Sequence, residues 1–417
     1  MLRIFKPKNP FTPFRFIFGL YNYFFTIYGK PLIFLLFFSI LFYSIAPYST
    51  YFHIIVSFLG VIFFISFISM YLLPYNIWVE RKLPSRVQAG KEFITRISVK
   101  NNSFLPVYAI SAEQIWKPPH FDQTSTSNLL LNIKRREIGE VSFKCRINQR
   151  GAFEVPASIV FSSFPFFLMR KGKYLRDKEI VLAYPKYTPL DGFELPVHRK
   201  YQPGGISLAS SIGDSTEYMN NRDYNPGDPM KKLDWKAYAR LQKLVIKEYQ
   251  EEYFVRIALV LDTYIPKRVK KKQIDDFENS VSLVAAIADY LSRKEYLIDI
   301  FVMGSEIYKL ASGRNIAFLQ NILDLLACVD FESTEYIQNL YDELTPKLKQ
   351  ISSIILVLQD FDENRKKLID LLRSLGVSLK IIIVKDKTTI PFSFKETDNL
   401  TVRFISSKRF EEGLSNL

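Results

Sequence analysis

Residues 222–240, RDYNPGDPMKKLDWKAYAR, form the stretch around which the chain is organised. Pro226 presets φ at the first corner of a turn and Gly227 can adopt a positive φ at the second, so the sequence predicts a tight reversal. A helix should start directly after it. Asp228 can accept hydrogen bonds from the free N–H groups of the first turn, and Pro229 needs no partner at the first helical position.

The apolar residues after this cap predict one buried helix face. They recur at spacings of three and four, and they are Met230, Leu233, Ala237 and Leu241. The basic side of this helix, which carries Trp235, is then either exposed to solvent or docked on another surface. One interpretation is structural, with a turn and a capped helix that pack one domain on another. The other is a binding surface, and the spacing by itself indicates no reaction.

The charge of the chain is concentrated in its N-terminal half. The 417 residues carry a net charge of +14 and predict two or three domains. Residues 1–75 hold five Lys or Arg and no acid, residues 76–185 hold eighteen against nine, and residues 186–417 hold thirty-three of each. A basic domain beside anionic headgroups explains this distribution better than nucleic acid does, so we expect no nucleic-acid partner. Cys145 and Cys328 predict neither a disulfide framework nor a zinc site.

Two uncharged apolar runs predict a transmembrane hairpin within residues 1–75. They cover about residues 29–46 and 51–73, close to the roughly 20 residues that a spanning helix needs. Basic residues precede the first run and follow the second, so the positive-inside rule predicts a multi-pass protein with both termini in the cytoplasm. Residues 16–28 predict an aromatic interfacial segment, with a re-entrant span as the alternative. His53 could mark a functional pathway, but a lone neutral imidazole near the interface is the favoured interpretation.

Period-two alternation over residues 76–185 predicts an antiparallel β-sandwich domain. Cys145 is in phase with Phe143 and Ile147, so we expect a buried thiol and not a nucleophile. The apolar segment at 162–168, SSFPFFL, is expected to pack on the membrane or on the next domain.

Residues 254–417 alternate apolar strands with helices and predict a doubly wound α/β domain. A linker rich in Pro, Gly and Ser, followed by the motif, fills residues 186–253. Ligands of such sheets bind beyond the carboxyl ends of the strands, where Asp262 and Asp360 stand. The two carboxylates could hold a hard cation. The alternative is that Asp262 caps a turn and Asp360 caps the following helix.

The motif resembles the signature of the bacterial family catalogued as domain of unknown function 58, and the order of domains is similar along nearly the whole chain. The resemblance implies a C-terminal domain of the von Willebrand factor type A kind. It also implies a non-catalytic adaptor or assembly factor at the inner face of the plasma membrane, with a MoxR-type AAA+ ATPase and other membrane or cytoplasmic proteins as partners. The signature residues are Arg222, Tyr224, Pro226, Gly227, Asp228, Asp234, Trp235, Lys236, Ala239 and Arg240.

This chain departs from the type A pattern at the metal site that the resemblance implies. That site uses Asp-x-Ser-x-Ser after the first strand, whereas here Asp262 is followed by Tyr264 and Pro266 at the hydroxyl positions. Arg314 lies in the loop that should supply a Thr, and the second Asp survives as Asp360. We therefore expect no cofactor and at most a degenerate magnesium site at Asp262 and Asp360.

The alternative function is a metal-dependent enzyme that uses the strand-end aspartates with Asp228 and Asp234. Outside the membrane runs, the histidines are His120 and His198, each in a predicted loop without a Ser or Cys nucleophile beside it. The residues themselves therefore favour a binding protein.

Overall fold

The structure is a computed structural model, and its two compact units are described separately. One unit comprises residues 1–186 with 323–329, and the other comprises residues 187–322 with 330–417. The described residues are 21–45, 48–73, 75–114, 118–195, 218–228, 230–249, 256–265, 271–303, 308–313, 316–333, 351–392, 394, 396–397 and 399–414. The predictions on Pro229, His198, Pro266 and Arg314 lie outside them.

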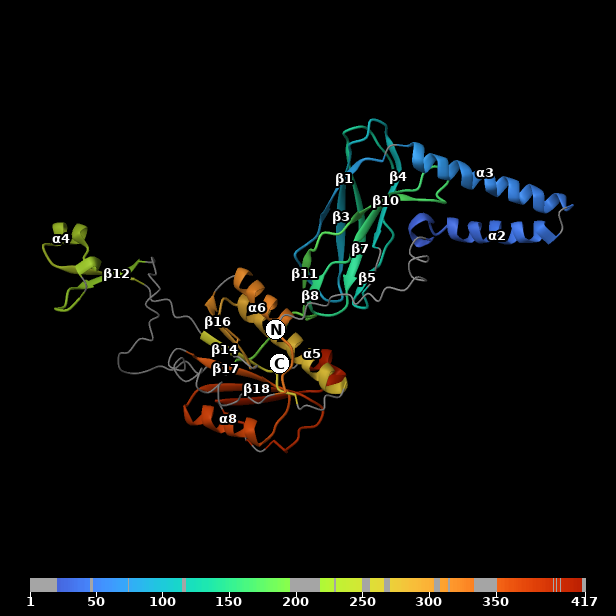
Figure 1. Cartoon of the computed structure of the whole chain (residues 1–417). Coiled ribbons are helices and arrows are strands. Elements are labelled where there is room, and N and C mark those ends of the chain that lie inside the picture. The colour runs from blue at the N-terminus through green and yellow to red at the C-terminus, as the bar shows by residue number, and fades with distance from the viewer. Residues whose placement is uncertain are drawn as a thin grey trace. The chain divides into compact units, whose positions relative to one another are not determined.

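The N-terminal unit contains a pair of apolar helices, α2 (Gly29–Ile45) and α3 (Thr50–Leu72) (Figure 1). Within the described residues, α3 is the one helix that is long and apolar enough to cross a membrane. The 17 residues of α2 are fewer than a typical span. The structure thus supports one apolar span, whereas the predicted hairpin had two. His53 lies beside the ring of Tyr43, with ring centroids 5.9 Å apart.

Antiparallel sheets follow, as the period-two alternation predicts. Phe143, Cys145 and Ile147 all point into a core that side chains from both four-stranded sheets share, so the predicted burial of Cys145 is confirmed. The first sheet is ordered β1 (Ile77–Lys82), β3 (Glu92–Asn101), β7 (Ile138–Ile147), β5 (Phe121–Gln123). The second is ordered β10 (Lys171–Leu175), β9 (Ser158–Ser162), β4 (Val107–Gln114), β6 (Leu130–Ile133). A third sheet is mixed, because β11 (Ile180–Tyr184) pairs in parallel with β2 (Arg86–Gln88) and antiparallel with β8 (Gly151–Glu154).

The second unit contains a sheet with five parallel strands and an antiparallel edge strand, β16. The parallel alternation was predicted, but β16 was not. The strand order is β16 (Tyr308–Gly313), β15 (Leu297–Met303), β14 (Arg256–Asp262), β17 (Ser353–Leu358), β18 (Ser378–Val384), β19 (Leu400–Ile405). The described helical elements that accompany this sheet are α5 (Lys271–Arg293), α8 (Glu363–Ser374), η3 (Ser407–Arg409) and α9 (Phe410–Leu414), while α6 (Ile316–Cys328) has residues in both units.

Helices cover this sheet because its central strands are apolar on both faces. Every residue of β17 is buried. The helix α8 packs Leu368 and Leu372 into one cluster with alternate side chains of β14, β17 and β18. The helix α5 contacts β14, β15 and β18, and Figure 1 shows it on the other side of the sheet. Because β14 and β17 are parallel neighbours, their carboxyl ends meet at one edge.

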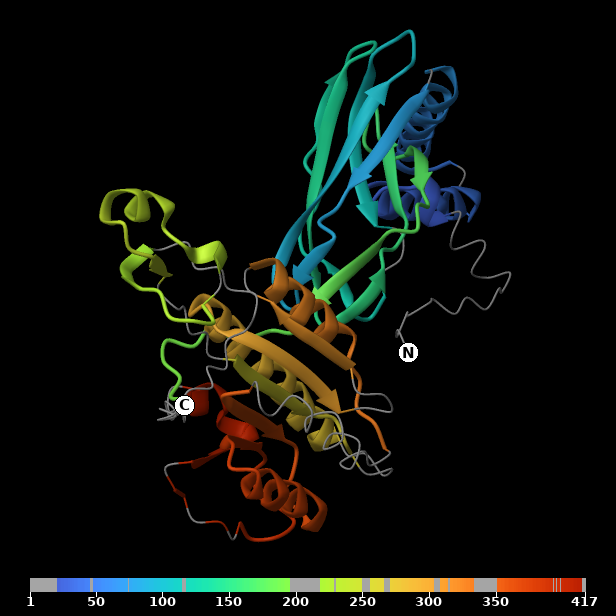
Figure 2. The same ribbon diagram turned by 90° about the vertical axis from the view of Figure 1, so that its left-hand side faces the viewer.

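The signature motif folds as a small hairpin of its own, which we call the signature lobe (residues 218–249). Its strands are β12 (Tyr218–Asp223) and β13 (Val245–Tyr249), paired antiparallel. Between them lie a 3-10 turn, η1 (Met230–Lys232), and a short helix, α4 (Trp235–Leu241) (Figure 2).

Candidate functional site

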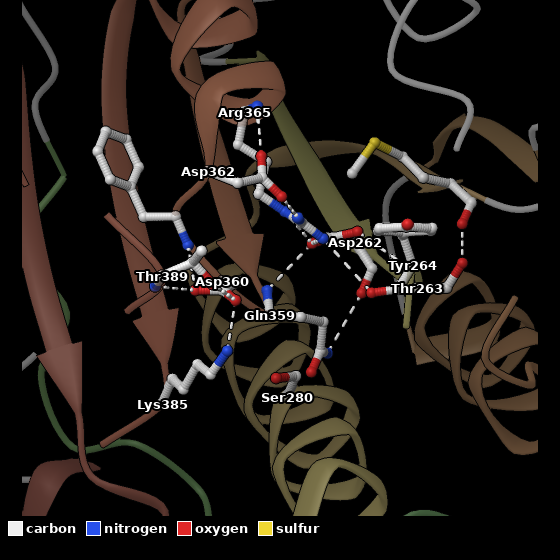
Figure 3. Close-up of polar contacts among 12 residues, drawn as sticks. Asp262, Thr263, Tyr264, Ser280, Gln359, Asp360, Asp362, Arg365, Lys385 and Thr389 are labelled. Atoms are coloured by element: carbon white, nitrogen blue, oxygen red, sulfur yellow. Dashed lines mark hydrogen bonds and ion pairs between the residues drawn. The ribbon is translucent and has the colours of Figure 1, made fainter. Parts of the chain in front are cut away.

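The carboxylate of Asp262 lies at the carboxyl end of β14 and is 2% exposed. Its Oδ1 accepts a hydrogen bond of 3.0 Å from the backbone N–H of Tyr264, and its Oδ2 accepts one of 3.1 Å from the N–H of Gln359 (Figure 3). The predicted turn-capping role of Asp262 therefore describes part of what this side chain does. A buried carboxylate also needs a counter-charge, because desolvation strongly disfavours its ionised form.

Arg365 supplies that charge from the first turn of α8. Its Nε lies 2.8 Å and its Nη2 2.6 Å from Oδ2 of Asp262, and the Arg365 side chain is 2% exposed. Its Nη1 also pairs with Asp362, and the guanidinium carbon lies 5.4 Å from the ring centroid of Tyr264. Burial alone would lower the pKa of Arg365, but the charges of Asp262 and Asp362 raise it above its usual value. The guanidinium therefore stays charged and neutralises the strand end.

Asp360 is neutralised in a separate contact one strand away. Its Oδ2 pairs with Lys385 Nζ and accepts from Thr389 Oγ1 at 2.6 Å, while Oδ1 accepts from the Thr389 N–H at 2.9 Å. Burial works to raise the pKa of Asp360, but the bonds from Lys385 and Thr389 hold it below its usual range. The interpretation of Asp360 as a helix cap is wrong, because Asp362 is the N-cap of α8 and accepts from Arg365 N–H.

The strand ends therefore form a closed network of ion pairs and hydrogen bonds. Tyr264, at a position where the resemblance implies a hydroxyl ligand, stacks on Arg365 instead. Within the described ranges, no three His, Cys, Asp or Glu side chains form a group suited to a metal. Chemically, the arrangement of Asp262 and Asp360 fixes the edge of the sheet, since each carboxylate already has a cation of the chain as its partner.

In the signature lobe, Arg222 and Asp228 form a two-pronged ion pair. The Nη1–Oδ2 and Nη2–Oδ1 distances are 2.7 and 2.8 Å. The same carboxylate accepts from Asn225 N–H at 2.9 Å. Gly227 has a φ of +107°, as the predicted turn requires. The hydrogen bonds from Arg222, foremost, and from Asn225 lower the pKa of Asp228 to about 2.

Asp234, not Asp228, caps the helix of the lobe, which corrects the predicted helix start. Its Oδ1 accepts from the N–H groups of Lys236 and Ala237, both at 3.0 Å, and Asn221 Nδ2 lies 3.1 Å from its Oδ2. Met230, the first residue of the predicted apolar face, lies instead in the 3-10 turn η1, and the chain restarts as α4 at Trp235. The carboxylate at residue 228 is unavailable as a cap because Arg222 and the turn hold it.

This restart divides the predicted apolar face. Leu233 and Ala237 are buried, but Met230 and Leu241 are exposed. The Trp235 side chain is 63% exposed and meets the ring of Tyr238 edge-on, with centroids 6.3 Å apart. With other exposed residues of η1, α4 and the turn that follows, they make up what we call the aromatic–basic surface: Met230, Lys231, Lys232, Trp235, Lys236, Tyr238, Arg240, Leu241 and Leu244.

The signature residues thus divide into two groups. One group holds the lobe together internally through Arg222, Gly227, Asp228 and Asp234, and Tyr224 N–H adds a backbone bond to Leu244 O at 3.1 Å. The other group faces outward and comprises Trp235, Lys236, Ala239 and Arg240, while Pro226 lies exposed at the turn. The structure does not bring the aspartates of the lobe into one described group with those of the strand ends.

The cations of the strand ends, Arg365 and Lys385, were not predicted from the sequence. A signal for Arg365 was present, because it precedes Leu368, Ile369 and Leu372 by three, four and seven residues and so shares their buried face. A charged residue in phase with a buried stripe indicates a buried partner. We find no comparable sequence signal for Lys385.

Part of the chain is similar to a known protein family. The family described as "Protein of unknown function DUF58" matches residues 220–390, which include most of the signature lobe and much of the parallel sheet. The chain is 30% identical over 122 residues to "Uncharacterized protein YeaD" of Bacillus subtilis (strain 168). That match covers 29% of this chain and 28% of YeaD, so the chain spans less than a third of that relative's length.

Solved structures give weaker likenesses. The pilus adhesin SpaC of Lactobacillus rhamnosus GG, in its open conformation, is 10% identical with a TM-score of 0.30, over 40% of this chain and 30% of SpaC. Proximal thread matrix protein 1 of the mussel byssus is 14% identical with a TM-score of 0.28, over 39% of this chain and 44% of that one. At these TM-scores neither likeness carries an argument about fold or function.

Proposed function

We propose, starting from the match of residues 220–390 to the DUF58 family, that the protein is a membrane-anchored, non-catalytic adaptor or assembly factor. It works at the cytoplasmic face of the bacterial plasma membrane with a MoxR-type AAA+ ATPase as its partner. In this proposal α2 and α3 form two spans with both termini in the cytoplasm. The sheets of the N-terminal unit form a β-sandwich, and the parallel sheet is of the von Willebrand factor type A kind.

The aromatic–basic surface of the signature lobe is the observation that carries this proposal. Trp, Tyr and Arg are the residues that most often dominate the binding energy of protein interfaces. Trp235, Tyr238 and Arg240 are all exposed on a helix of seven residues, although burial of Trp235 would remove much apolar area from water. Their support is rigid, since Asp234 caps the helix and Leu233 and Ala237 anchor it.

The strand ends support the non-catalytic part of the proposal. Asp262 and Asp360 are each committed to a cation of the chain. The alternative, a metal-dependent enzyme that uses these aspartates, requires Arg365 and Lys385 to leave their carboxylates before any ion can enter. No observation in the described residues favours that exchange, so the adaptor remains the function that the geometry supports best.

The test is a binding measurement with the full-length chain in lipid nanodiscs and the purified MoxR-type ATPase of the same organism. We expect Trp235→Ala to weaken binding by about 2 kcal/mol, roughly thirtyfold in Kd. Trp78→Ala is the matched control, because Trp78 is also exposed but lies on β1 of the other unit, and its loss should leave Kd unchanged. Absence of binding by the unaltered chain, or equal affinity of both variants, contradicts the proposal.

A further inference from the structure

Exposed aromatic and aliphatic side chains gather in two loops of the β-sheet domain. One loop, between β3 and β4, carries Phe104, which is 69% exposed, and Leu105. The other, between β9 and β10, carries Phe164, Phe166 and Phe167, all exposed. We call these five residues the apolar rim. Side chains of this kind on a soluble surface mark an interaction site.

Both loops lie beside the last turn of α3. Pro106 from the first loop and Phe164 from the second line the same cavity as Met70 and Leu73. Lys171 Nζ donates to the carbonyl oxygen of Met70 at 2.9 Å and so caps the end of the apolar helix. The apolar rim is therefore continuous with the end of the one described helix that can cross a membrane.

The segment that precedes α2 fastens the second loop to the same place. Thr26 N–H donates to Leu168 O at 3.1 Å, and Arg170 N–H donates to Phe24 O at 2.8 Å. Tyr23 stacks on Tyr174 with ring centroids 5.5 Å apart. These backbone bonds leave the β-sheet domain little freedom to move away from the ends of the helices.

A basic turn adjoins the first loop. Lys134, Arg135 and Arg136 are all exposed, at the turn between β6 and β7. The buried side chain of Asn101 ties this turn to the loop, because its Nδ2 donates to Leu105 O at 2.8 Å and to Ile133 O at 3.0 Å. An apolar tip and a cluster of cations are thus held at the same end of the domain.

We propose that the apolar rim inserts into the headgroup region of the bilayer while the basic turn at 134–136 binds anionic phospholipid headgroups. Aromatic side chains favour this depth, and Lys and Arg side chains near the surface are attracted to anionic headgroups. The β-sheet domain is then a peripheral membrane-binding domain in addition to its tether. This inference rests on the part of the proposed function in which α3 anchors the chain.

The test uses tryptophan quenching by brominated phospholipids, with the full-length chain in nanodiscs. Trp78, Trp116 and Trp235 are first replaced by Phe, and single tryptophans are then introduced by Phe104→Trp and, in a second chain, Phe166→Trp. We expect lipids brominated near the headgroup to quench both. The controls are Phe58→Trp, exposed near the middle of α3 and expected to be quenched by lipids brominated deep in the acyl chain, and Ile94→Trp, exposed on β3 seven residues from Asn101 and expected to be quenched by neither lipid.

Each outcome decides the question. Quenching of Phe58→Trp and both rim variants, but not of Ile94→Trp, supports the proposal. Quenching of Phe58→Trp alone overturns the proposal and leaves the membrane anchor standing, whereas absence of quenching at Phe58→Trp overturns the anchor as well.

For the basic turn, added phosphatidylglycerol should increase the quenching of Phe104→Trp. Replacement of Lys134, Arg135 and Arg136 by Gln should abolish that increase, and an unchanged response overturns the role of the cations.

Discussion

The strand-end network and the signature lobe use the same chemical pair, an arginine and an aspartate, in different surroundings. Arg365 and Asp262 are each 2% exposed, so each charge is stabilised by the other and not by water. Arg222 and Asp228 meet at the surface, where their side chains are 37% and 17% exposed and water still solvates them. We therefore expect the buried pair to affect the stability of a domain, whereas the exposed pair mainly orients a turn.

The largest expected effect comes from removal of the buried cation. Arg365→Ala leaves Asp262 desolvated without a counter-charge, and such a change typically destabilises by about 3–5 kcal/mol. Hydrogen exchange of the β14 and β17 amides, followed by mass spectrometry of the full-length chain, measures the effect within this domain. Lys367→Ala is the control, because it removes an exposed cation from the same helix. Equal protection from hydrogen exchange in the two variants would show that the buried pair does not stabilise the domain more than an exposed cation does.

Lys380 on β18 is a second buried cation, and it donates a hydrogen bond to a backbone carbonyl oxygen. Its Nζ donates to Glu194 O at 2.6 Å and lies 3.9 Å from the ring centroid of Phe193. Burial, followed by the charge of Arg403, lowers the pKa of Lys380 to about 8 from 10.5. Below about pH 8 Lys380 is charged in the folded state, and its buried charge destabilises the fold. The free energy of unfolding therefore rises as the pH increases from about 8 toward 10.5.

We expect Lys380→Met to stabilise the α/β domain at pH 7 and to remove this rise, with a smaller effect than that of Arg365→Ala. Urea midpoints from pulse proteolysis at pH 7 and pH 10 measure both. Lys367→Met serves as the control and should keep the slope of the unaltered chain. A variant that is less stable at pH 7 would mean that the contacts of Lys380 outweigh the burial of its charge.

The smallest effect is expected at the exposed pair. The pKa of Asp228 lies at about 2, below its ordinary 3.8, so the pair contributes stability above pH 3.8 and loses it as the pH falls through 2. Fluorescence of Trp235, in a chain with Trp78 and Trp116 replaced by Phe, should change over this window. Asp228→Asn should already show the acid-state signal at pH 7. A transition at the same pH in both chains would show that Asp228 does not control the lobe.

Local pattern predicted most of the second unit. The predicted alternation of apolar strands with helices over residues 254–417 is observed in the order β14, α5, β15, then β17, α8 and β18. The predicted helix face of the signature was wrong at Met230 and Leu241, because periodicity alone does not show where a helix is interrupted. The antiparallel strand β16 was missed, since a short edge strand has no continuous apolar run.

The sequence by itself determined the pair of apolar helices, the turn at Gly227, the alternating strands and the positions of Asp262 and Asp360 at strand ends. These features depend on neighbours within a few residues, whose spacing sets which face a side chain takes. Only the tertiary structure decided the partner of each charge. Arg365 lies 103 residues from Asp262 in the chain, and Asp228 is paired with Arg222 and not with the helix that follows it. Such pairings depend on which segments folding brings together, and local spacing does not encode that.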